Sequence, residues 1–439
     1  MGREVGVLAI GAGPANLALA VAIEESGADG LADGTLLLEQ GPDIKWQRDL
    51  LMPWARSQVS FLKDLVTLRN PTSRFSFLNF LHERGRLDEF VNLGTFHPFR
   101  WEFSDYLQWV ASSLERVGIR YGARVVRVDP VAGSDGAVAG WEVLLSDGDR
   151  VRCRVVGLGG GRYARVPGVC AGLASDRVIH SAQYRSRIAR VGRDEALRVV
   201  VVGGAQSAAE MFFAVHENLP RSRVTMVVRS IGLQNYQTSK FVNELFFPSF
   251  VDDFYGAAPQ VRAQVLDEMR FTNYAGLAPP FLDELYMMLY RQRMLGEERS
   301  EVRAMTEVVS ARMEGEEVVL DLRDRLSGKT EPLRCDLVLL GTGFDPRKPE
   351  LVRDLAARLG LDEEVQVGRN YRVELGESAW GAVYLQGVNE ETHGIADSLI
   401  SVLANRSKDI LDDLLARRAT TQARSATTQA NPTTEARSA

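Results

Sequence analysis

The sequence predicts an α/β protein made of two Rossmann-like domains, one inserted into the other. Two segments predict this fold, because each reads as an apolar strand, a glycine turn and an Ala-rich helix: VGVLAIGAGPANLALAVAIEES and LRVVVVGGAQSAAEMFFAVHENL. The length of 439 residues also exceeds that of one ordinary domain. Glycines in such a turn let the backbone approach a pyrophosphate, and the helix N-terminus offers it N–H donors. Both domains are therefore predicted to bind a dinucleotide.

The first unit has the features of an FAD site. Its turn is Gly11-Ala12-Gly13-Pro14, and Asn16 stands where a third glycine often sits. The next apolar strand, TLLLEQ, ends in Glu39, about 20 residues beyond the turn. An acid at that distance is placed to bind ribose hydroxyl groups.

The second unit differs in a way that points to NADPH. Its turn reads Gly203-Gly204-Ala205, and the following strand, VTMVVRS, ends in Arg229 instead of an acid. An arginine there suits a 2′-phosphate, which an acid would repel. The sequence therefore predicts FAD in the first domain and NADPH in the second.

Two later segments are expected to complete the FAD domain. CDLVLLGTGFDP reads as a strand and a turn, and VYLQGVNEETHGIADSLISVLANRS as a strand, a polar loop and a helix from near Gly394. The intervening insertion reads as mostly helical, with no clear strand, and a substrate pocket is expected there. The predicted order is FAD domain 1–165, NADPH domain 166–330 with the insertion at about 231–305, FAD return 331–410, and a disordered, Thr/Ala/Ser-rich tail 417–439.

Composition narrows the function classes. A net charge of −6 without a Lys/Arg block argues against nucleic acid as a partner, and no apolar run approaches the ~18 residues of a membrane span. The start, MGREVGVLAIG, runs directly into a strand, so a cytoplasmic protein is expected. The three cysteines form no C-x-x-C pair, and the five histidines are too dispersed for a metal site. O₂ is left as the electron acceptor, which indicates a monooxygenase or an oxidase.

Several stretches then resemble one family closely. They are GAGPAN, SFLKDLVTLRNPTS, RWEFSDYLQW, GGAQSAAE, KFVNELFFP, TNY, GTGFDP and ETHGIADSLIS. The chain is similar, from residue 5 to about 406, to the flavin-dependent N-hydroxylating monooxygenases of siderophore biosynthesis, most closely those that act on L-ornithine. The resemblance implies FAD, NADPH and O₂ as reactants, N5-hydroxyornithine formed through a C4a-hydroperoxyflavin, and a homo-oligomer, tetramer or dimer.

The resemblance also implies site residues at matching positions. It places these residues at the substrate: Lys63 as the carboxylate clamp, Asn243, Glu244, Leu245, Phe246, Asn273 and Ser401. It places these at FAD: Gly11, Gly13, Pro14, Asn16, Glu39, Gln40, Lys45, Trp46, Gln47, Gln58, Val125, Ser398, Leu399 and Ser401. It places these at NADPH: Arg100, Gly204, Ala205, Gln206, Ser207, Arg229, Asn273, Tyr274 and Ala275. No catalytic residue and no metal ligand are assigned.

Alternatives stay open at this point. Within N-hydroxylases, L-lysine or a diamine is a rival substrate, although the pairing of FVNE with TNY favours ornithine. A sulfur- or ketone-oxidising flavin monooxygenase is a second rival, because HSAQY at 180–184 half-matches that group's fingerprint. A nucleotide-binding redox sensor without turnover is a third. The family's usual pattern also changes at Gln47, Ala205, Gly341 and Phe344.

Overall fold

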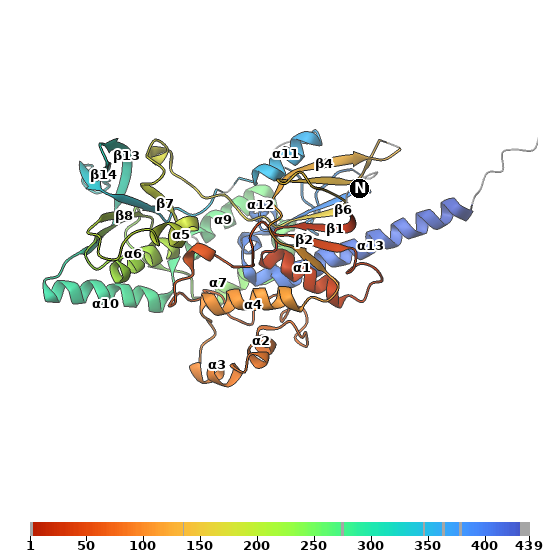
Figure 1. Cartoon of the computed structure of the whole chain (residues 1–439), viewed down its shortest axis with the longest axis horizontal. Helices are drawn as coiled ribbons and strands as arrows, with labels where there is room; N and C mark the ends of the chain where they lie inside the picture. Colours follow the sequence, from red (N-terminus) through yellow and green to blue (C-terminus); the bar gives the residue numbers. More distant parts are fainter. Residues whose placement is uncertain are drawn as a thin grey trace, which may run out of the picture.

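The computed structural model places two α/β lobes side by side along the long axis of the molecule (Figure 1). One lobe is built on β1, β2 and β6, and the other on β8, β9 and β16. This arrangement confirms the predicted fold class of two Rossmann-like domains. The structure describes residues 3–134, 136–273, 276–345, 347–361, 365–376 and 380–430.

The first lobe centres on a seven-stranded sheet in the order β3-β2-β1-β6-β5-β4, with β17 also paired to β6. The strands β1, β2, β3, β6 and β17 are parallel to one another, whereas β5 runs antiparallel to both of its neighbours, β6 and β4. The strands are β1 Arg3–Ile10, β2 Thr35–Leu38, β3 Gly118–Arg120, β4 Val125–Ala132, β5 Val138–Leu145, β6 Arg150–Leu158 and β17 Ala382–Leu385. The strands β2 and β17 and the second half of β1 are buried and almost entirely apolar, because both faces of the sheet are covered there.

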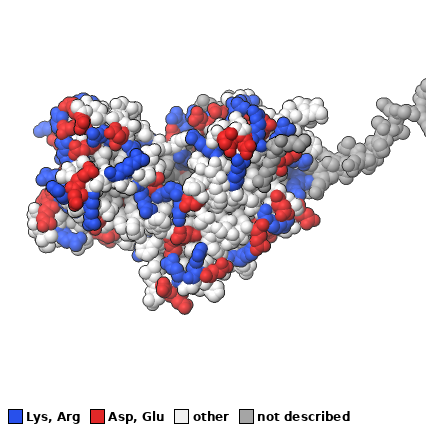
Figure 2. Space-filling view, viewed as in Figure 1, with Lys and Arg blue, Asp and Glu red and all other residues white. Residues whose placement is uncertain are grey.

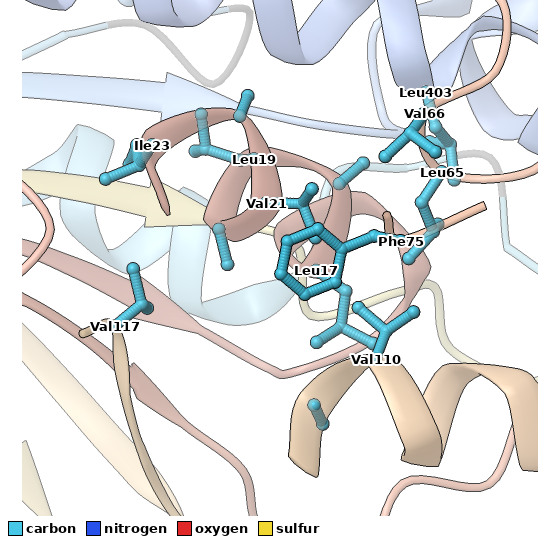
Figure 3. Packing of buried hydrophobic residues seen from close by; sticks show 14 of the residues in the cluster. Leu17, Leu19, Val21, Ile23, Leu65, Val66, Phe75, Val110, Val117 and Leu403 are labelled. Atoms are coloured by element: carbon cyan, nitrogen blue, oxygen red, sulfur yellow. The ribbon is translucent and has the colours of Figure 1, made fainter. Parts of the chain in front are cut away.

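Helices close both faces of this sheet. On one face α1, α4 and α13 share a core with residues of the loop that follows position 63, including Leu65, Val66 and Phe75 (Figure 3). On the other face α11 packs against β4. The helices of this lobe are α1 Pro14–Glu25, α2 Phe77–Glu83, α3 Leu87–Leu93, α4 Arg100–Ser113, α11 Glu350–Arg358, α12 Glu390–His393 and α13 Leu403–Ala430, with the 3₁₀ turns η1 Arg48–Leu50, η5 Ile395–Ser398 and η6 Ile400–Val402.

The second lobe contains a five-stranded parallel sheet in the order β12-β9-β8-β16-β7. A three-stranded antiparallel sheet, β13-β14-β15, shares a core with one face, and α6 and α10 cover the other. The elements are β7 Val178–His180, β8 Arg198–Val202, β9 Arg223–Val227, β12 Ser300–Arg303, β13 Thr306–Glu314, β14 Glu317–Asp324, β15 Thr330–Cys335, β16 Leu337–Leu340, α5 Tyr184–Ile188 and α6 Gln206–Asn218, with η2 Gly168–Cys170 and η3 Ser181–Gln183.

Two domain predictions are wrong in detail. The strand of CDLVLLGTGFDP, β16, was expected in the FAD return from 331, but it pairs with β8 and β7 of the second lobe. The chain crosses back only afterwards, where Ala164 bridges Phe344. The insertion was expected to add no strand, yet Ser300–Arg303 forms the edge strand β12 beside β9. Both errors concern short strands whose partners are distant in sequence, which local patterns do not reveal.

The remainder of the insertion is helical, as predicted. It contains a parallel pair of very short strands and a series of helices that reach from the second lobe towards the first. Its elements are β10 Gln234–Asn235, α7 Lys240–Asn243, η4 Glu244–Phe246, α8 Phe250–Gly256, α9 Pro259–Asn273, β11 Gly276–Leu277 and α10 Pro279–Leu295. Three elements of the insertion contact the first lobe: η4 contacts η5, and both α8 and α9 contact α12.

The C-terminal segment also differs from expectation. The helix predicted from near Gly394 begins at Leu403, after two 3₁₀ turns, and continues to Ala430. The predicted disordered tail from 417 is therefore helical as far as 430, and 431–439 lie outside the described residues. The first turns of α13 pack on α1. A helix that is held at one end needs no new nucleus to continue, so packing of its first turns favours its extension.

Acidic and basic side chains are interspersed over the face shown in Figure 2. Of the helices that the structure describes, none combines the length and apolarity required to cross a bilayer. The described residues also contain no group of three or more His, Cys, Asp and Glu side chains able to hold a metal ion.

Candidate functional site

The turn after β1 and the end of β2 meet as predicted. The N–H of Gly11 donates to the Leu38 carbonyl at 2.8 Å, and the N–H of Ala12 donates to Glu39 Oε2 at 2.9 Å. The other oxygen of Glu39 accepts the Gly41 N–H at 2.8 Å. Helix α1 starts at Pro14, and its Gly13 N-cap provides no side-chain cap. An acid and an uncapped helix N-terminus therefore stand together, which is the arrangement required by a ribose and a pyrophosphate.

Asn16, which stands where a glycine is common, forms hydrogen bonds that no glycine could make. It is buried, and its Nδ2 donates to the carbonyls of Ile10 and Gly11 at 2.9 and 2.7 Å. Its Oδ1 accepts a hydrogen bond from Gln386 Nε2 at 2.7 Å, which joins the β1 turn to the end of β17. The space is provided by Gly159, where a Cβ would lie 2.8 Å from Asn16 Nδ2.

Two buried oxygens in the same region have no hydrogen-bond partner among the described residues. They are Gln386 Oε1 and Asn389 Oδ1, and both side chains lie just beyond β17. A buried acceptor without a donor is costly, by about 1–3 kcal/mol. Ligand hydroxyl groups are donors of the kind that both oxygens lack, so this edge of the sheet fits the polyhydroxylated chain of FAD. The sequence analysis missed both residues, although polar side chains directly after a buried strand are a usable signal.

The segment after Glu39 runs along α4. Lys45 forms an ion pair with Asp105 at 2.9 Å, the Trp46 N–H donates to Ser104 Oγ at 3.0 Å, and the Trp46 ring contacts Phe103 edge-on. Of the other residues predicted at FAD, Gln40 is exposed, Gln47 has a φ of 50°, and Val125 is the half-buried first residue of β4. The structure thus holds Lys45 and Trp46 against α4 and places Val125 on β4, and the contacts of all these residues with FAD stay predictions.

The second nucleotide turn is tightly packed. Gly203 has a φ of 141°, and a Cβ there would approach the Gly341 carbonyl oxygen to 2.4 Å. Ala205 is the extended N-cap of α6 and forms no side-chain cap, so the first N–H groups of the helix are available beside Gly204, Gln206 and Ser207. Arg229 is exposed just beyond β9. This geometry leaves room for a dinucleotide pyrophosphate at the start of α6, and the contacts of these residues with NADPH stay predictions.

A hydrogen bond between two glutamines connects the first lobe to the N-terminus of α6. Gln58, predicted at FAD, donates through Nε2 to Oε1 of Gln206, predicted at NADPH, at 3.3 Å. Gln206 Oε1 also accepts the Ala278 N–H at 3.0 Å, and its Nε2 donates to Glu210 at 2.9 Å. The loop that carries Gln58 therefore contacts the N-terminus of α6 across the boundary between the lobes.

Arg100 makes a contact that the sequence did not predict. Its guanidinium donates to both carboxylate oxygens of Glu210 at 2.7 and 2.9 Å, and to the Leu50 carbonyl at 2.6 Å. The side chains of Arg100 and Glu210 are only 4% and 1% exposed. The pair therefore joins α4 of the first lobe to α6 of the second, whereas the contact of Arg100 with NADPH stays a prediction.

Lys63 lies half-buried in a loop whose backbone is fixed by the side chain of the next residue. Asp64 is buried, and its carboxylate accepts the N–H groups of Val66, Thr67 and Phe77 at 2.7–2.9 Å. Within the described part of the chain no carboxylate lies in ion-pair distance of the Lys63 ammonium, and burial lowers its pKa. An unpaired, partly desolvated cation of this kind favours an incoming anion.

A series of contacts links this loop to two other predicted substrate segments, η6 and η4. Val66 packs in the same cluster as Leu403, which directly follows η6 with its buried Ser401 (Figure 3). In turn η5, which ends at Ser398, contacts η4 with Leu245 and Phe246. Of the predicted set, Asn243 and these two apolar residues are half-buried, Leu399 is extended between η5 and η6, and Ser398 donates to Glu390 at 2.6 Å.

Two further residues predicted at the substrate belong to the insertion. Glu244 is exposed, and Asn273 is the last residue of α9. Tyr274 and Ala275 lie outside the described residues.

Comparisons of the sequence and the fold with known proteins point to one family. The model of the L-lysine 6-monooxygenase/L-ornithine 5-monooxygenase family matches residues 4–346. The chain is 37% identical to the L-ornithine N(5)-monooxygenase of Pseudomonas aeruginosa, with 93% of both chains covered. Among solved structures, the ornithine N-hydroxylase of Kutzneria sp. 744, described with reduced FAD, NADP⁺ and L-ornithine, superposes with a TM-score of 0.88 at 34% identity, covering 95% of this chain and 100% of the other. The L-lysine 6-monooxygenase of Pseudomonas syringae superposes with a TM-score of 0.83 at 31% identity, covering 94% and 99%.

Proposed function

Because the chain belongs to the L-lysine 6-monooxygenase/L-ornithine 5-monooxygenase family, we propose that it is an FAD- and NADPH-dependent L-ornithine N5-monooxygenase. The observation that carries this proposal is the series of contacts that links the Lys63 loop to η5–η6 and η4, together with the hydrogen bond from Gln58 to Gln206 between the lobes. The product, N5-hydroxyornithine, serves a siderophore or a related natural product. The family assignment sets aside two alternatives from the sequence analysis, the sulfur- or ketone-oxidising monooxygenase and the redox sensor.

The residues at the first turn suit FAD. Glu39 binds ribose hydroxyl groups, the N-terminus of α1 faces the pyrophosphate, and the unpaired oxygens of Gln386 and Asn389 accept hydroxyl groups. Bound FAD, with NADPH and O₂, supplies the redox chemistry that delivers an oxygen atom to the substrate amine. The protein must position that amine and keep water away from the reacting centre.

The substrate is held at its two ends in this proposal. Lys63 binds the α-carboxylate, and Asn243 and Ser401 bind the polar groups further along the molecule. Only a neutral amine is nucleophilic, and a free side-chain amine has a pKa of about 10. The half-buried Leu245 and Phe246 lower the local polarity, which favours loss of the amine proton on binding.

We also propose a cytoplasmic homo-oligomer, either a tetramer or a dimer. Cys153, Cys170 and Cys335 are buried free thiols, as expected in a reducing compartment. Five large apolar side chains on α10 are exposed, which suits burial against another copy: Tyr286, Met287, Tyr290, Met294 and Leu295.

With FAD, NADPH and O₂, the protein is expected to convert L-ornithine to N5-hydroxyornithine and to act at least tenfold less efficiently on L-lysine. One extra methylene in a fitted pocket costs about 1–3 kcal/mol, or 10- to 200-fold. The assay measures hydroxylamine together with NADPH oxidation, because oxidation alone also reports peroxide release. Faster hydroxylation of lysine or of putrescine would overturn the substrate assignment while leaving the reaction class intact.

Arg229→Ala is expected to weaken flavin reduction by NADPH roughly 10- to 150-fold and to leave reduction by NADH within about twofold. The reason is the loss of one charge-assisted contact with the 2′-phosphate, worth about 1.5–3 kcal/mol. Stopped-flow measurement of flavin reduction with both coenzymes checks this. Equal losses for the two coenzymes contradict the assignment of Arg229.

A further inference from the structure

A second arginine lies next to Arg229, and it comes from a different part of the chain. Arg325 belongs to the turn between β14 and β15, and its Nη1 donates to the carbonyl of Arg229 at 2.7 Å. The two residues are 96 positions apart in sequence. The sequence analysis assigned no function to Arg325.

The turn that carries Arg325 is held firmly at the end of β9. The carboxylate of Asp324 accepts the N–H groups of Leu326 and Ser327 at 2.7 and 2.8 Å, which closes the turn. The Arg325 N–H donates to the Met305 carbonyl at 2.7 Å, and the Met305 N–H donates to the Ser230 carbonyl at 2.9 Å. The Arg325 backbone is thus tied through one residue to the strand end that carries Arg229.

This strand end also borders the second nucleotide turn. A Cβ on Gly204 would lie 2.8 Å from Val228 Cγ1 and 3.8 Å from Ser230 Oγ. In a Rossmann domain, the nucleotide's ribose lies at the end of this strand, where the presence or absence of a 2′-phosphate is recognised. Arg325 therefore stands where the phosphate of NADPH would be located.

Around Arg229 and Arg325, positive side chains outnumber the carboxylates that could neutralise them. Arg229 and Arg325 are both exposed. The carboxylate of Glu307 forms an ion pair with Arg323, and that of Asp324 is bonded within its own turn. The Arg323 hydrogen bond lowers the pKa of Glu307, and Arg325 and Arg229 add to this effect by charge. Three guanidinium groups thus surround one ion-paired carboxylate.

We infer that Arg325 and Arg229 together form a two-arginine clamp for the 2′-phosphate of NADPH. A planar guanidinium presents several N–H donors that match phosphate oxygens, and Arg325 uses one of them on the Arg229 carbonyl. The inference rests on the proposed NADPH dependence and adds a residue that determines coenzyme specificity. The competing explanation is that Arg325 only caps the end of β9.

The test measures the affinity of the FAD-loaded protein for adenosine 2′,5′-bisphosphate and for 5′-AMP by isothermal titration calorimetry. Arg325→Ala is expected to weaken the bisphosphate about 10- to 100-fold and 5′-AMP less than twofold, because only the bisphosphate carries the 2′-phosphate. Arg325→Gln keeps a donor for the Arg229 carbonyl but removes the charge, and it is expected to match Arg325→Ala. Arg334→Ala, on exposed β15 beside Glu314, is the matched control.

The outcomes separate this inference from the proposed function. A wild-type protein that binds the bisphosphate no better than 5′-AMP refutes the NADPH assignment itself. A wild-type preference that both Arg325 variants retain refutes only the clamp. An Arg325→Gln variant with wild-type affinity beside a weakened Arg325→Ala variant assigns Arg325 to capping, and equal losses for both ligands do the same.

Discussion

Lys63→Ala is expected to lower kcat/KM for L-ornithine between about 30-fold and several thousand-fold. Removing one partner of a buried charge pair costs about 2–5 kcal/mol, because the other charge is left without compensation. At tenfold per 1.4 kcal/mol, that cost gives the stated range. Reduction of the flavin by NADPH before substrate binds is expected to change much less.

The structure gives reasons for so large an effect. The Lys63 ammonium is partly desolvated, and within the described residues it has no carboxylate partner, so burial alone lowers its pKa. A substrate carboxylate would supply the missing charge. The loop cannot easily relax to let another residue replace Lys63, because Asp64 fixes three backbone N–H groups and Leu65 and Val66 are fully buried.

Both half-reactions must be measured on one preparation of the variant. Lys408→Ala is a suitable control, since Lys408 is exposed and paired with Asp412 on α13. A surface lysine changes stability by less than ~0.5 kcal/mol, so the control is expected to stay within about twofold in both steps. An unchanged kcat/KM for ornithine would mean that Lys63 is a solvated surface charge and does not bind the substrate carboxylate. A loss confined to flavin reduction would make it a coenzyme residue.

The features that sequence analysis predicted well are local ones. The two strand–turn–helix units are contiguous, and the positions of Glu39 and Arg229 follow from the strand that ends just before each residue. Lys63 was assigned through the resemblance of SFLKDLVTLRNPTS to one family, and the structure places Leu65 and Val66 of that stretch in the core. Such patterns need no knowledge of distant partners.

The features that sequence analysis missed depend on contacts between remote segments. The strand LVLL of β16 is equally suited to either sheet, and only its pairing with β8 assigns it. Asn16 reads as an imperfect glycine motif until Gln386, 370 residues away, supplies its partner. Arg325 reads as one of many turn charges until the turn folds onto β9. In each case burial or pairing chosen by the tertiary fold decides the role.

Arg100→Ala is expected to destabilise the protein by about 3–5 kcal/mol, because Glu210 would be left as a buried, uncompensated carboxylate. The two side chains are 4% and 1% exposed and share two hydrogen bonds, so water cannot replace the lost guanidinium. The pair connects α4 of one lobe with α6 of the other. The loss is therefore expected to loosen the contact between the lobes before either sheet unfolds.

The measurement is urea denaturation followed by FAD fluorescence and by circular dichroism, compared as transition midpoints because two domains need not unfold in one step. Arg74→Ala, which breaks an exposed pair with Glu115, is the matched control and is expected to cost at most about 1 kcal/mol. The double variant Arg100→Met with Glu210→Leu is expected to recover most of the lost stability, since an apolar pair leaves no buried charge. If Arg100→Ala instead keeps the wild-type midpoints and loses affinity for NADP⁺, the arginine is a coenzyme ligand, as the sequence predicted, and its pairing with Glu210 contributes little to holding the lobes together.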